Sequence, residues 1–225
     1  LDGVGRIFGI TLEYNHFDWS CETWLRTGQM MPEDGMKQLA QNDAILLGAV
    51  GYPGVPDHLS LWGLLLKIRR EFDQYVNLRP VRLLPGIPCP LANKKPGDVD
   101  FWIVRENVEG EYSQVGGRFA EGTAAEGVVQ SAVFTKLGTD RILRYASDLA
   151  RTIGRPHETS APKSNGLYHS MPSWAERFAA IGEEYPDVTM DPYHIEILVA
   201  RLVRSPDRFV VGVGGSFFGY FLSCP

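Results

Sequence analysis

The sequence predicts an α/β fold, and three observations carry that prediction. Short apolar runs alternate along the chain with stretches of helical periodicity, as strands alternate with helices. The 225 residues are 44% hydrophobic and 22% charged, which is typical of a globular protein and excludes a disordered or fibrous one. A chain of this length buries roughly 70–75% of its unfolded surface, enough for one large domain or two small ones.

The first half of the chain is expected to alternate strands with helices. Ile10–Phe17 alternates like a half-buried strand, and the continuous apolar run Ala44–Val50 indicates a fully buried one. Pro32–Gln41 is expected to be a helix because proline at the first helical position gives up no hydrogen bond. Ser60–Val76 opens on a capping serine and is a longer helix. Val99–Arg105 is the next expected strand.

The second half continues the alternation. Val128–Phe134 is expected to be a strand, and Asp140–Ile153 an amphipathic helix. Pro172–Tyr185 and Pro192–Arg204 are two further helices opened by proline, and Phe209–Val213 is a terminal strand. The last residues, 214–225 (GGSFFGYFLSCP), form an apolar tail without a polar face. Such a surface is normally covered, so the chain is expected to be incomplete.

Composition excludes several classes of function. The net charge is −5 and the pI about 5.6, so no electrostatic footprint for nucleic acid or an anionic membrane is visible. No apolar run approaches the ~20 residues that span a bilayer. Cys21, Cys89 and Cys224 are widely spaced and odd in number, which favours a reducing compartment, the cytoplasm, over a disulfide framework.

Three arginines are the first candidates for binding chemistry. Arg69 lies on the long helix, Arg79 just beyond it, and Arg105 at the end of a strand. Guanidinium groups that converge on one cleft would suit a dicarboxylate. The alternative is that these arginines are solvated or pair with nearby acidic residues, and spacing alone favours that alternative.

Tyr112 and Lys163 are the next candidates, and both lie in loops, where functional side chains are often placed. A desolvated lysine can act as a base near neutral pH. Taken singly, each is more often surface decoration. The histidines have no metal-ligand spacing, and the acidic cluster of Asp187, Asp191 and Glu196 is by default helix-terminus electrostatics, with a metal site the minority alternative.

Long motifs give a family resemblance. The segments LLGAVGYPGVPDHLSLWGLLLKIRREFDQYVNLRPVR, FWIVRENVEGEYSQVGGR and KSNG closely resemble the β-decarboxylating dehydrogenases, the isocitrate/isopropylmalate dehydrogenase family. Within that family, VPDHLSLWG and FDQYVNLRPVR are most similar to the branch that acts on tartrate and D-malate. The resemblance runs from about residue 5 to about residue 225.

The resemblance implies an activity and its residues. The family oxidises a small 2-hydroxy dicarboxylic acid with NAD, usually with Mg²⁺ or Mn²⁺, and then decarboxylates the product. Tyr112 matches the general acid, and Lys163 the residue that assists deprotonation of the hydroxyl in the partner subunit's site. The positions that match substrate contacts are Ser60, Arg69, Arg79 and Arg105. The family is dimeric, so a homodimer is expected.

The resemblance also implies an isopropylmalate-dehydrogenase-like two-domain fold that is incomplete in this chain. Residues 1–89 would form an incomplete first α/β domain. Residues 90–213 would form a second domain with a dimerisation arm at about 112–135, and residues 214–225 an aberrant apolar tail. The family's opening strand and its adenosine-binding region are not expected in this chain.

The metal ligands depart from the family pattern. A family metal aspartate is Glu196 here, and two others fall on Tyr220 and Cys224. Tyrosine does not replace a carboxylate, and cysteine is a soft ligand for a hard ion, so metal binding is expected to be weak. Three alternatives therefore stay open: a catalytically inactive truncated remnant, a carboxylate-binding module without chemistry, and a relative of isopropylmalate dehydrogenase.

Overall fold

The computed structural model describes residues 1–223 and divides into two compact units, Leu1–Phe72 and Asp73–Pro225. The segment 73–89, which the sequence analysis assigns to the first domain, falls in the second unit. Its strand β1 (Val76–Arg82) pairs along its whole length with β2 (Asp100–Glu106). The division between the units therefore precedes the boundary predicted at Cys89.

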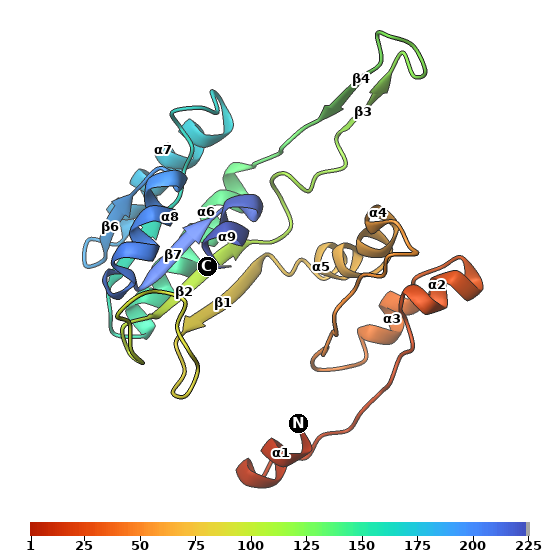
Figure 1. The fold of residues 1–225 in the computed structure, drawn as a ribbon, viewed down its shortest axis with the longest axis horizontal. Coiled ribbons are helices and arrows are strands. Elements are labelled where there is room, and N and C mark those ends of the chain that lie inside the picture. Colours follow the sequence, from red (N-terminus) through yellow and green to blue (C-terminus); the bar gives the residue numbers. More distant parts are fainter. Residues whose placement is uncertain (224–225) are drawn as a thin grey trace. The chain divides into compact units, whose positions relative to one another are not determined.

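The first unit consists of short helices joined by long irregular segments (Figure 1). Its helices are α1 (Asp2–Phe8), α2 (Cys21–Thr27), α3 (Gly35–Leu39), α4 (Asp57–Ser60), the π-helical turn η1 (Leu61–Leu65) and α5 (Leu66–Glu71). The last three are continuous and form the helix predicted from Ser60, which begins earlier and ends earlier than expected. A small core holds them, with Met30, Leu64 and Ile68 buried.

Neither strand predicted for the first unit is present within residues 1–72. Residues 10–17 and 44–50 are irregular and largely exposed, and the side chain of Leu46 is 81% exposed. A strand is stabilised by hydrogen bonds to a neighbouring strand. No strand is described in this unit for either segment to pair with, so both strand predictions are wrong.

A five-stranded mixed sheet organises the second unit, in the order β1-β2-β7-β5-β6. The strands β5 (His157–Ser160), β6 (Thr189–Pro192) and β7 (Val211–Gly214) run parallel with β2, while β1 is an antiparallel edge strand. The strands β2 and β7 confirm the predictions for 99–105 and 209–213, whereas β5 and β6 were not predicted. The carboxyl ends of parallel strands lie at one edge of a sheet, where ligands of α/β proteins usually bind.

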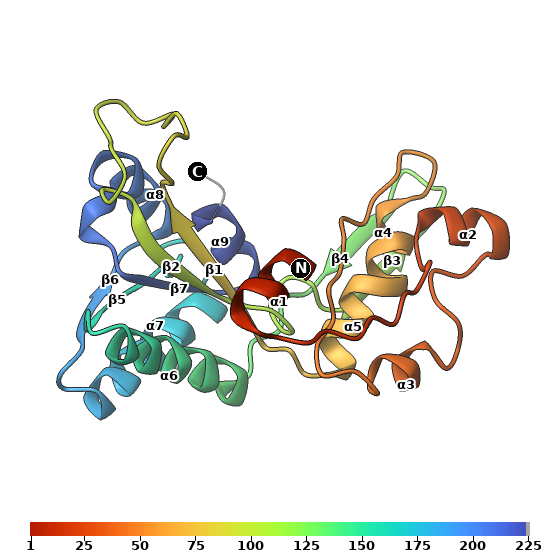
Figure 2. The same ribbon diagram turned by 90° about the horizontal axis from the view of Figure 1, so that it is seen from below.

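Helices cover both faces of this sheet (Figure 2). The helices α6 (Lys136–Thr152) and α7 (Ser170–Glu184) lie on one face, and α8 (Ile195–Arg204) and α9 (Ser216–Leu222) lie on the other. Two apolar cores fill the layers, one centred on Ile142 and Trp174 and one on Ile103 and Leu198. The three predicted helices are present, but Pro192 ends β6 and does not open α8, and α7 begins two residues before Pro172. Within residues 1–223 no helix combines the length and apolar character needed to cross a bilayer.

The apolar tail is part of this architecture. Its residues 216–222 form α9, which packs on β2 and β7 and buries Phe218 and Leu222. The segment expected to be an aberrant tail is therefore a regular helix over residues 216–222 with one face packed, while Phe217, Tyr220 and Phe221 remain more than 40% exposed. Cys224 lies outside the described residues.

A two-stranded hairpin extends away from the five-stranded sheet (Figure 1). It is formed by β3 (Gly116–Phe119) and β4 (Gly127–Gln130), so the strand predicted at 128–134 is regular only in its first residues. Its apolar side chains Phe119, Val128 and Val129 are all more than half exposed. The hairpin lies within the segment that the family resemblance assigns to a dimerisation arm.

Candidate functional site

Two of the predicted arginines lie on the same face of the sheet. In the β1–β2 register, Arg105 is opposite Asn77 and Arg79 is opposite Ile103. Residues two apart on a strand share a face, so Arg79 and Arg105 are diagonal neighbours. This is the face that α9 covers, near the carboxyl end of β2.

The guanidinium of Arg105 is buried and held by the residue that opens α9. Its side chain is 3% exposed. Its Nε donates to the carbonyl oxygen of Ser216 at 2.6 Å and its Nη2 to Ser216 Oγ at 3.1 Å. Burial lowers the pKa of Arg105, and the positive charge of Arg79 lowers it further. Two like charges on one face provide a ready attraction for an anion.

Gly219 permits this arrangement. A β-carbon at Gly219 would lie 2.7 Å from Cγ of Arg105 and 2.8 Å from its Cβ. Any side chain at this position would therefore collide with the arginine. The close approach of α9 to β2 depends on that glycine.

Tyrosine rings complete the cluster. The ring of Tyr220 lies 5.7 Å from the guanidinium carbon of Arg79 and 5.9 Å from that of Arg105, within cation–π range of both. Tyr112, 38% exposed, has its ring 5.8 Å from the guanidinium carbon of Arg105. Arg79 is oriented further, since its Nε donates to Asn77 Oδ1 at 3.0 Å and its Nη1 to Ser223 Oγ at 2.7 Å.

Lys163 and Glu196 form a separate pair. Lys163 follows β5, Glu196 lies in the first turn of α8, and Lys163 Nζ donates to Glu196 Oε1 at 2.6 Å. Asn165 Nδ2 donates to the same oxygen at 3.2 Å. The hydrogen bond from Lys163 is the main cause that lowers the pKa of Glu196 to about 2. Lys163 can accept a proton only when this ion pair opens.

The remaining predicted residues, Ser60 and Arg69, belong to the first unit. Ser60 ends α4, is fully buried, and its Oγ donates to the carbonyl oxygen of Asp57 at 3.3 Å. Arg69 is half-buried on α5. The roles of both as substrate contacts stay predictions.

Sequence reasoning missed the residues that position the arginines. Ser216, Gly219 and Ser223 all lie in the segment read only as an apolar tail. The available signal was the spacing of small residues inside an apolar run, which is typical of a helix that packs closely on its neighbours. Asn77, which hydrogen-bonds Arg79, could have been found from its position two residues away on a strand.

The described residues do not fit a divalent metal ion. Among residues 1–223, no three His, Cys, Asp or Glu side chains gather in a way that could hold one. Glu196 is engaged by Lys163, and Tyr220 contributes an aromatic ring to the arginines in place of a carboxylate. Hard ions require several oxygen ligands, and residues 1–223 by themselves do not supply that donor set.

The glycines around β7 do not form a cradle for a dinucleotide. A β-carbon at Gly212 would lie 2.7 Å from the side chain of Ile103, and one at Gly214 would lie 3.3 Å from the backbone nitrogen of Gly219. These glycines therefore serve the packing of the sheet and α9. No cofactor-binding residue is assigned in this chain.

Comparisons with known proteins agree with this architecture. The chain is 57% identical over 225 residues to the D-malate dehydrogenase [decarboxylating] of Escherichia coli (strain K12), and 57% identical over 226 residues to the tartrate dehydrogenase/decarboxylase of Pseudomonas putida. Each match covers 99% of this chain and 62% of the relative, so the chain spans about 62% of the length of these relatives.

A solved structure is also similar. The isocitrate dehydrogenase of Methylococcus capsulatus superimposes with a TM-score of 0.85 at 26% identity, over 98% of this chain and 62% of that one. The model of the isocitrate/isopropylmalate dehydrogenase family matches residues 1–224. The chain therefore belongs to the isocitrate/isopropylmalate dehydrogenase family.

Proposed function

We propose that this chain supplies the substrate-carboxylate site of an NAD-dependent dehydrogenase that oxidises and decarboxylates a small 2-hydroxy dicarboxylic acid such as tartrate or D-malate. The observation that carries the proposal is the pair Arg79 and Arg105, two cations fixed side by side by Ser216, Ser223 and Tyr220. The names of the relatives from E. coli and P. putida support it.

The arginines bind and orient the acid. A guanidinium held in place before the ligand arrives loses little conformational freedom on binding. The entropy cost of binding a carboxylate is therefore lower, and the affinity is higher. Arg105 uses its Nε and Nη2 on Ser216, and Arg79 uses its Nε and Nη1 on Asn77 and Ser223, so the guanidinium hydrogens outside these bonds are the donors proposed for the substrate carboxylates.

Two further residues handle protons in this proposal. The hydroxyl of Tyr112, beside Arg105, donates a proton to the carbon that loses carboxylate. Lys163, once released from Glu196 and after losing a proton to solvent, accepts the proton of the substrate hydroxyl in the partner subunit's site. NAD is the proposed hydride acceptor, and Mg²⁺ or Mn²⁺ is not assigned to residues of this chain because its described donors do not fit one.

The proposed active form is a cytoplasmic homodimer. Support comes from the exposed apolar side chains of the β3–β4 hairpin and from an exposed apolar stripe on α8 and α9. The stripe includes Ile197, Val203, Phe217 and Phe221, each more than 40% exposed. A second copy of the chain would cover such surfaces.

Calorimetry with D-malate and meso-tartrate tests the binding step. Arg79→Gln is expected to weaken binding about tenfold or more, because a hydrogen bond between two charged groups is lost. Arg118→Gln, on the hairpin, removes an equal charge and is the control, with less than a twofold change expected. Equal affinity in the parent and Arg79→Gln would contradict the proposal.

The competing function is carboxylate binding without turnover. Tyr220 stacked on the two arginines, together with the lack of a three-ligand acidic cluster in residues 1–223, favours it. Formation of NADH, followed by absorbance with each acid, separates the two. Saturable binding of D-malate with no NADH formed, with or without Mn²⁺, would support the binding module and overturn the dehydrogenase assignment.

A further inference from the structure

A second cationic cavity lies elsewhere in the second unit. It has a volume of about 510 Å³, within the range of small-molecule sites. Its lining includes His157, the first residue of β5, and Val210, which directly precedes β7. His157 and Val210 lie at the amino ends of β5 and β7, and the lining continues along β6 to Asp191 and Tyr193, whereas Arg105, near the carboxyl end of β2, does not line it. The cavity is therefore distinct from the candidate active site.

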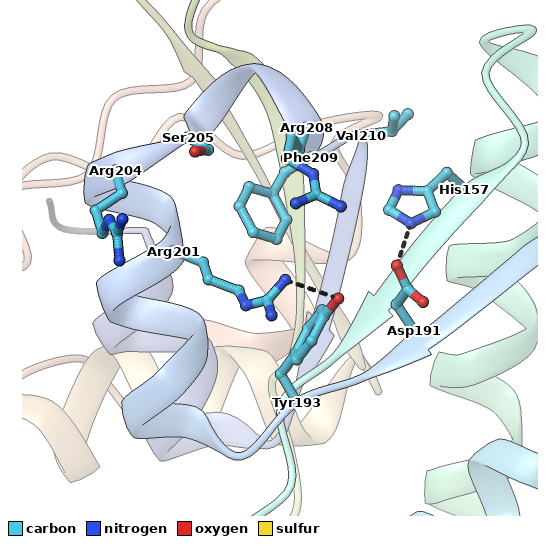
Figure 3. A pocket seen from close by; sticks show the side chains of 9 residues that line it. All are labelled: His157, Asp191, Tyr193, Arg201, Arg204, Ser205, Arg208, Phe209 and Val210. Atoms are coloured by element: carbon cyan, nitrogen blue, oxygen red, sulfur yellow. Dashed lines mark hydrogen bonds and ion pairs between the residues drawn. The ribbon is translucent and has the colours of Figure 1, made fainter.

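Arginines dominate its polar lining. Arg201 and Arg204 come from the last turn of α8, and Arg208 comes from the 3₁₀ turn η2 (Pro206–Arg208) that follows. In Figure 3 the guanidinium groups of Arg201 and Arg208 extend into the space beside the ring of Phe209, while Arg204 lies at the outer edge. Three cations thus border one cavity.

Within residues 1–223 none of these arginines forms a salt bridge with a carboxylate. Arg201 donates to the hydroxyl of Tyr193 at 3.0 Å, which is a neutral partner. One carboxylate, that of Asp191, belongs to the lining and contacts His157 Nε2 at 2.8 Å, while Asp207 pairs with Lys94 at 3.4 Å. By contrast, each arginine in a set on α6 and α7 has a carboxylate partner. That set is Arg141, Arg144, Arg151 and Arg177.

The helix C-terminus explains only part of this charge. Cations in the last turn of a helix are stabilised by the helix dipole, which accounts for the positions of Arg201 and Arg204. Arg208 lies beyond α8, in η2, and is not in that turn. Its guanidinium brings a third arginine charge to the same space, against the one lining carboxylate of Asp191, and this excess of positive charge favours the binding of an anion.

The apolar wall narrows the class of anion. Phe209 and Val210 are buried beside the cavity, and the ring of Tyr193 lies 4.2 Å from the guanidinium carbon of Arg201. A ligand that fits must combine a compact anionic group for the guanidinium forks with an apolar or planar body for this wall. A phosphate dianion offers three oxygens to several arginine donors at once.

We propose that this cavity is a binding site for a phosphate monoester with an apolar or planar group. Arg208 and Arg201 hold the phosphate, and Tyr193 and Phe209 contact the body of the ligand. The site does not depend on the proposed dehydrogenase function, since none of its residues takes part in that proposal.

Titration of the whole chain with phenyl phosphate tests the site, by calorimetry and by the imidazole resonances of His157. Saturable binding is expected, about tenfold tighter than that of inorganic phosphate because the ring contacts the apolar wall. Arg208→Gln is expected to weaken phenyl phosphate binding about tenfold or more. Within residues 1–223 the side chain of Arg208 is in no described ion pair, and Arg204→Gln is a second variant with the same property.

Arg144→Gln is the matched control because it removes the same charge from α6, far along the chain from this cavity's arginines. Its affinity for phenyl phosphate is expected to change by less than twofold. The proposal is overturned by a lack of saturable binding, by unchanged affinity in Arg208→Gln, or by an equal loss in Arg144→Gln. Inorganic phosphate binding as tightly as phenyl phosphate would overturn the assignment of a monoester with an apolar body. D-malate binding is measured in the same samples, so failure here leaves the proposed function untouched.

Discussion

The two compact units differ in how far their apolar side chains are buried. In residues 73–223 the sheet is covered on both faces, and the cores around Trp174 and Ile103 are almost free of solvent. In residues 1–72 the core is small, and Ile10, Leu12 and Leu46 are exposed within irregular segments. Similar apolar runs therefore give strands only where neighbouring strands exist to pair with them.

This difference shows where stability resides. Burial of apolar surface contributes roughly 25 cal/mol per Å², and hydrogen-bonded strands add cooperative order. The second unit has both contributions, so it should set the unfolding midpoint of the chain. Four changes can break or sharpen that contrast.

The largest effect is expected from Trp174→Ala. Trp174 is 1% exposed, packs edge-on against Phe134, and donates from Nε1 to Ser160 Oγ at 2.9 Å. Its removal leaves a cavity and an unpaired hydroxyl, which should lower the free energy of unfolding by about 3–5 kcal/mol. Urea denaturation of the parent and the variant measures this difference in the free energy of unfolding. Leu46→Ala, in the first unit, should change the same quantity by less than about 0.5 kcal/mol, and equal effects would remove the contrast.

Glu158 should give the second unit a pH-dependent stability. Burial raises the pKa of Glu158 to about 8, while Ser147 donates to it at 2.5 Å and partly opposes the shift. An unfolded glutamate titrates near pH ~4.3. The folded chain thus retains a proton that the unfolded chain releases, so this contribution is full below about pH 4 and is lost as pH rises to about 8.

The size of that contribution is a few kcal/mol, to an order of magnitude. Glu158→Gln keeps a neutral side chain at every pH, so its free energy of unfolding should fall less than the parent's between pH 5 and pH 8. Urea midpoints at the two pH values measure the difference. Glu183→Gln, exposed on α7, is the control and should keep the parent's slope. Identical slopes in all three proteins would show that Glu158 is ionised when folded.

A smaller effect, confined to the candidate site, is expected from Gly219→Ala. The added methyl group would displace the side chain of Arg105, weakening D-malate binding about tenfold, or about 1.4 kcal/mol. Gly117→Ala is the control because its β-carbon would meet no atom within 4 Å. Calorimetry compares the affinities of the two variants for D-malate. Unchanged affinity in Gly219→Ala would show that D-malate binding does not depend on the position of the Arg105 side chain.

The smallest effect is expected from Arg118→Gln on the hairpin. Arg118 and Glu126 form an exposed ion pair at 3.1 Å, and such pairs contribute about 0–1 kcal/mol. Urea unfolding should therefore change by less than 1 kcal/mol, and the change should vanish at high salt. A larger loss would mean that the hairpin contributes to the stability of the second unit.

The sequence predicted the fold best where local pattern and pairing agree. The helices around Asp140, Trp174 and Leu198 have strong helical periodicity and are present, as are β2 and β7. The strands β5 and β6 were not predicted because each is only four residues long and carries polar residues, as in His157–Ser160. The runs at 10–17 and 44–50 failed because pairing partners are not visible in a local window.

The candidate site was predicted in part. Arg79, Arg105 and Tyr112 were named from their motifs, and the structure places the two arginines on one face of the sheet with the ring of Tyr112 5.8 Å from the guanidinium carbon of Arg105. The contacts that orient them come from α9, more than 100 residues away in sequence, and no local pattern indicates such contacts. The arginines of α8 and η2 that line the second cavity were not singled out from the sequence, because charge pairing depends on the tertiary structure.

The π-helical turn at Leu61–Leu65 has a consequence for how this chain tolerates change. A turn closed by hydrogen bonds to the fifth residue holds one residue more than an α-helical turn. The helix from Asp57 to Glu71 therefore carries a surplus residue, and deleting one there would restore ordinary helical spacing and leave the flanking turns in register. Insertions and deletions usually accumulate in loops, and in this chain the helix with the π-helical turn can tolerate a change of length as well.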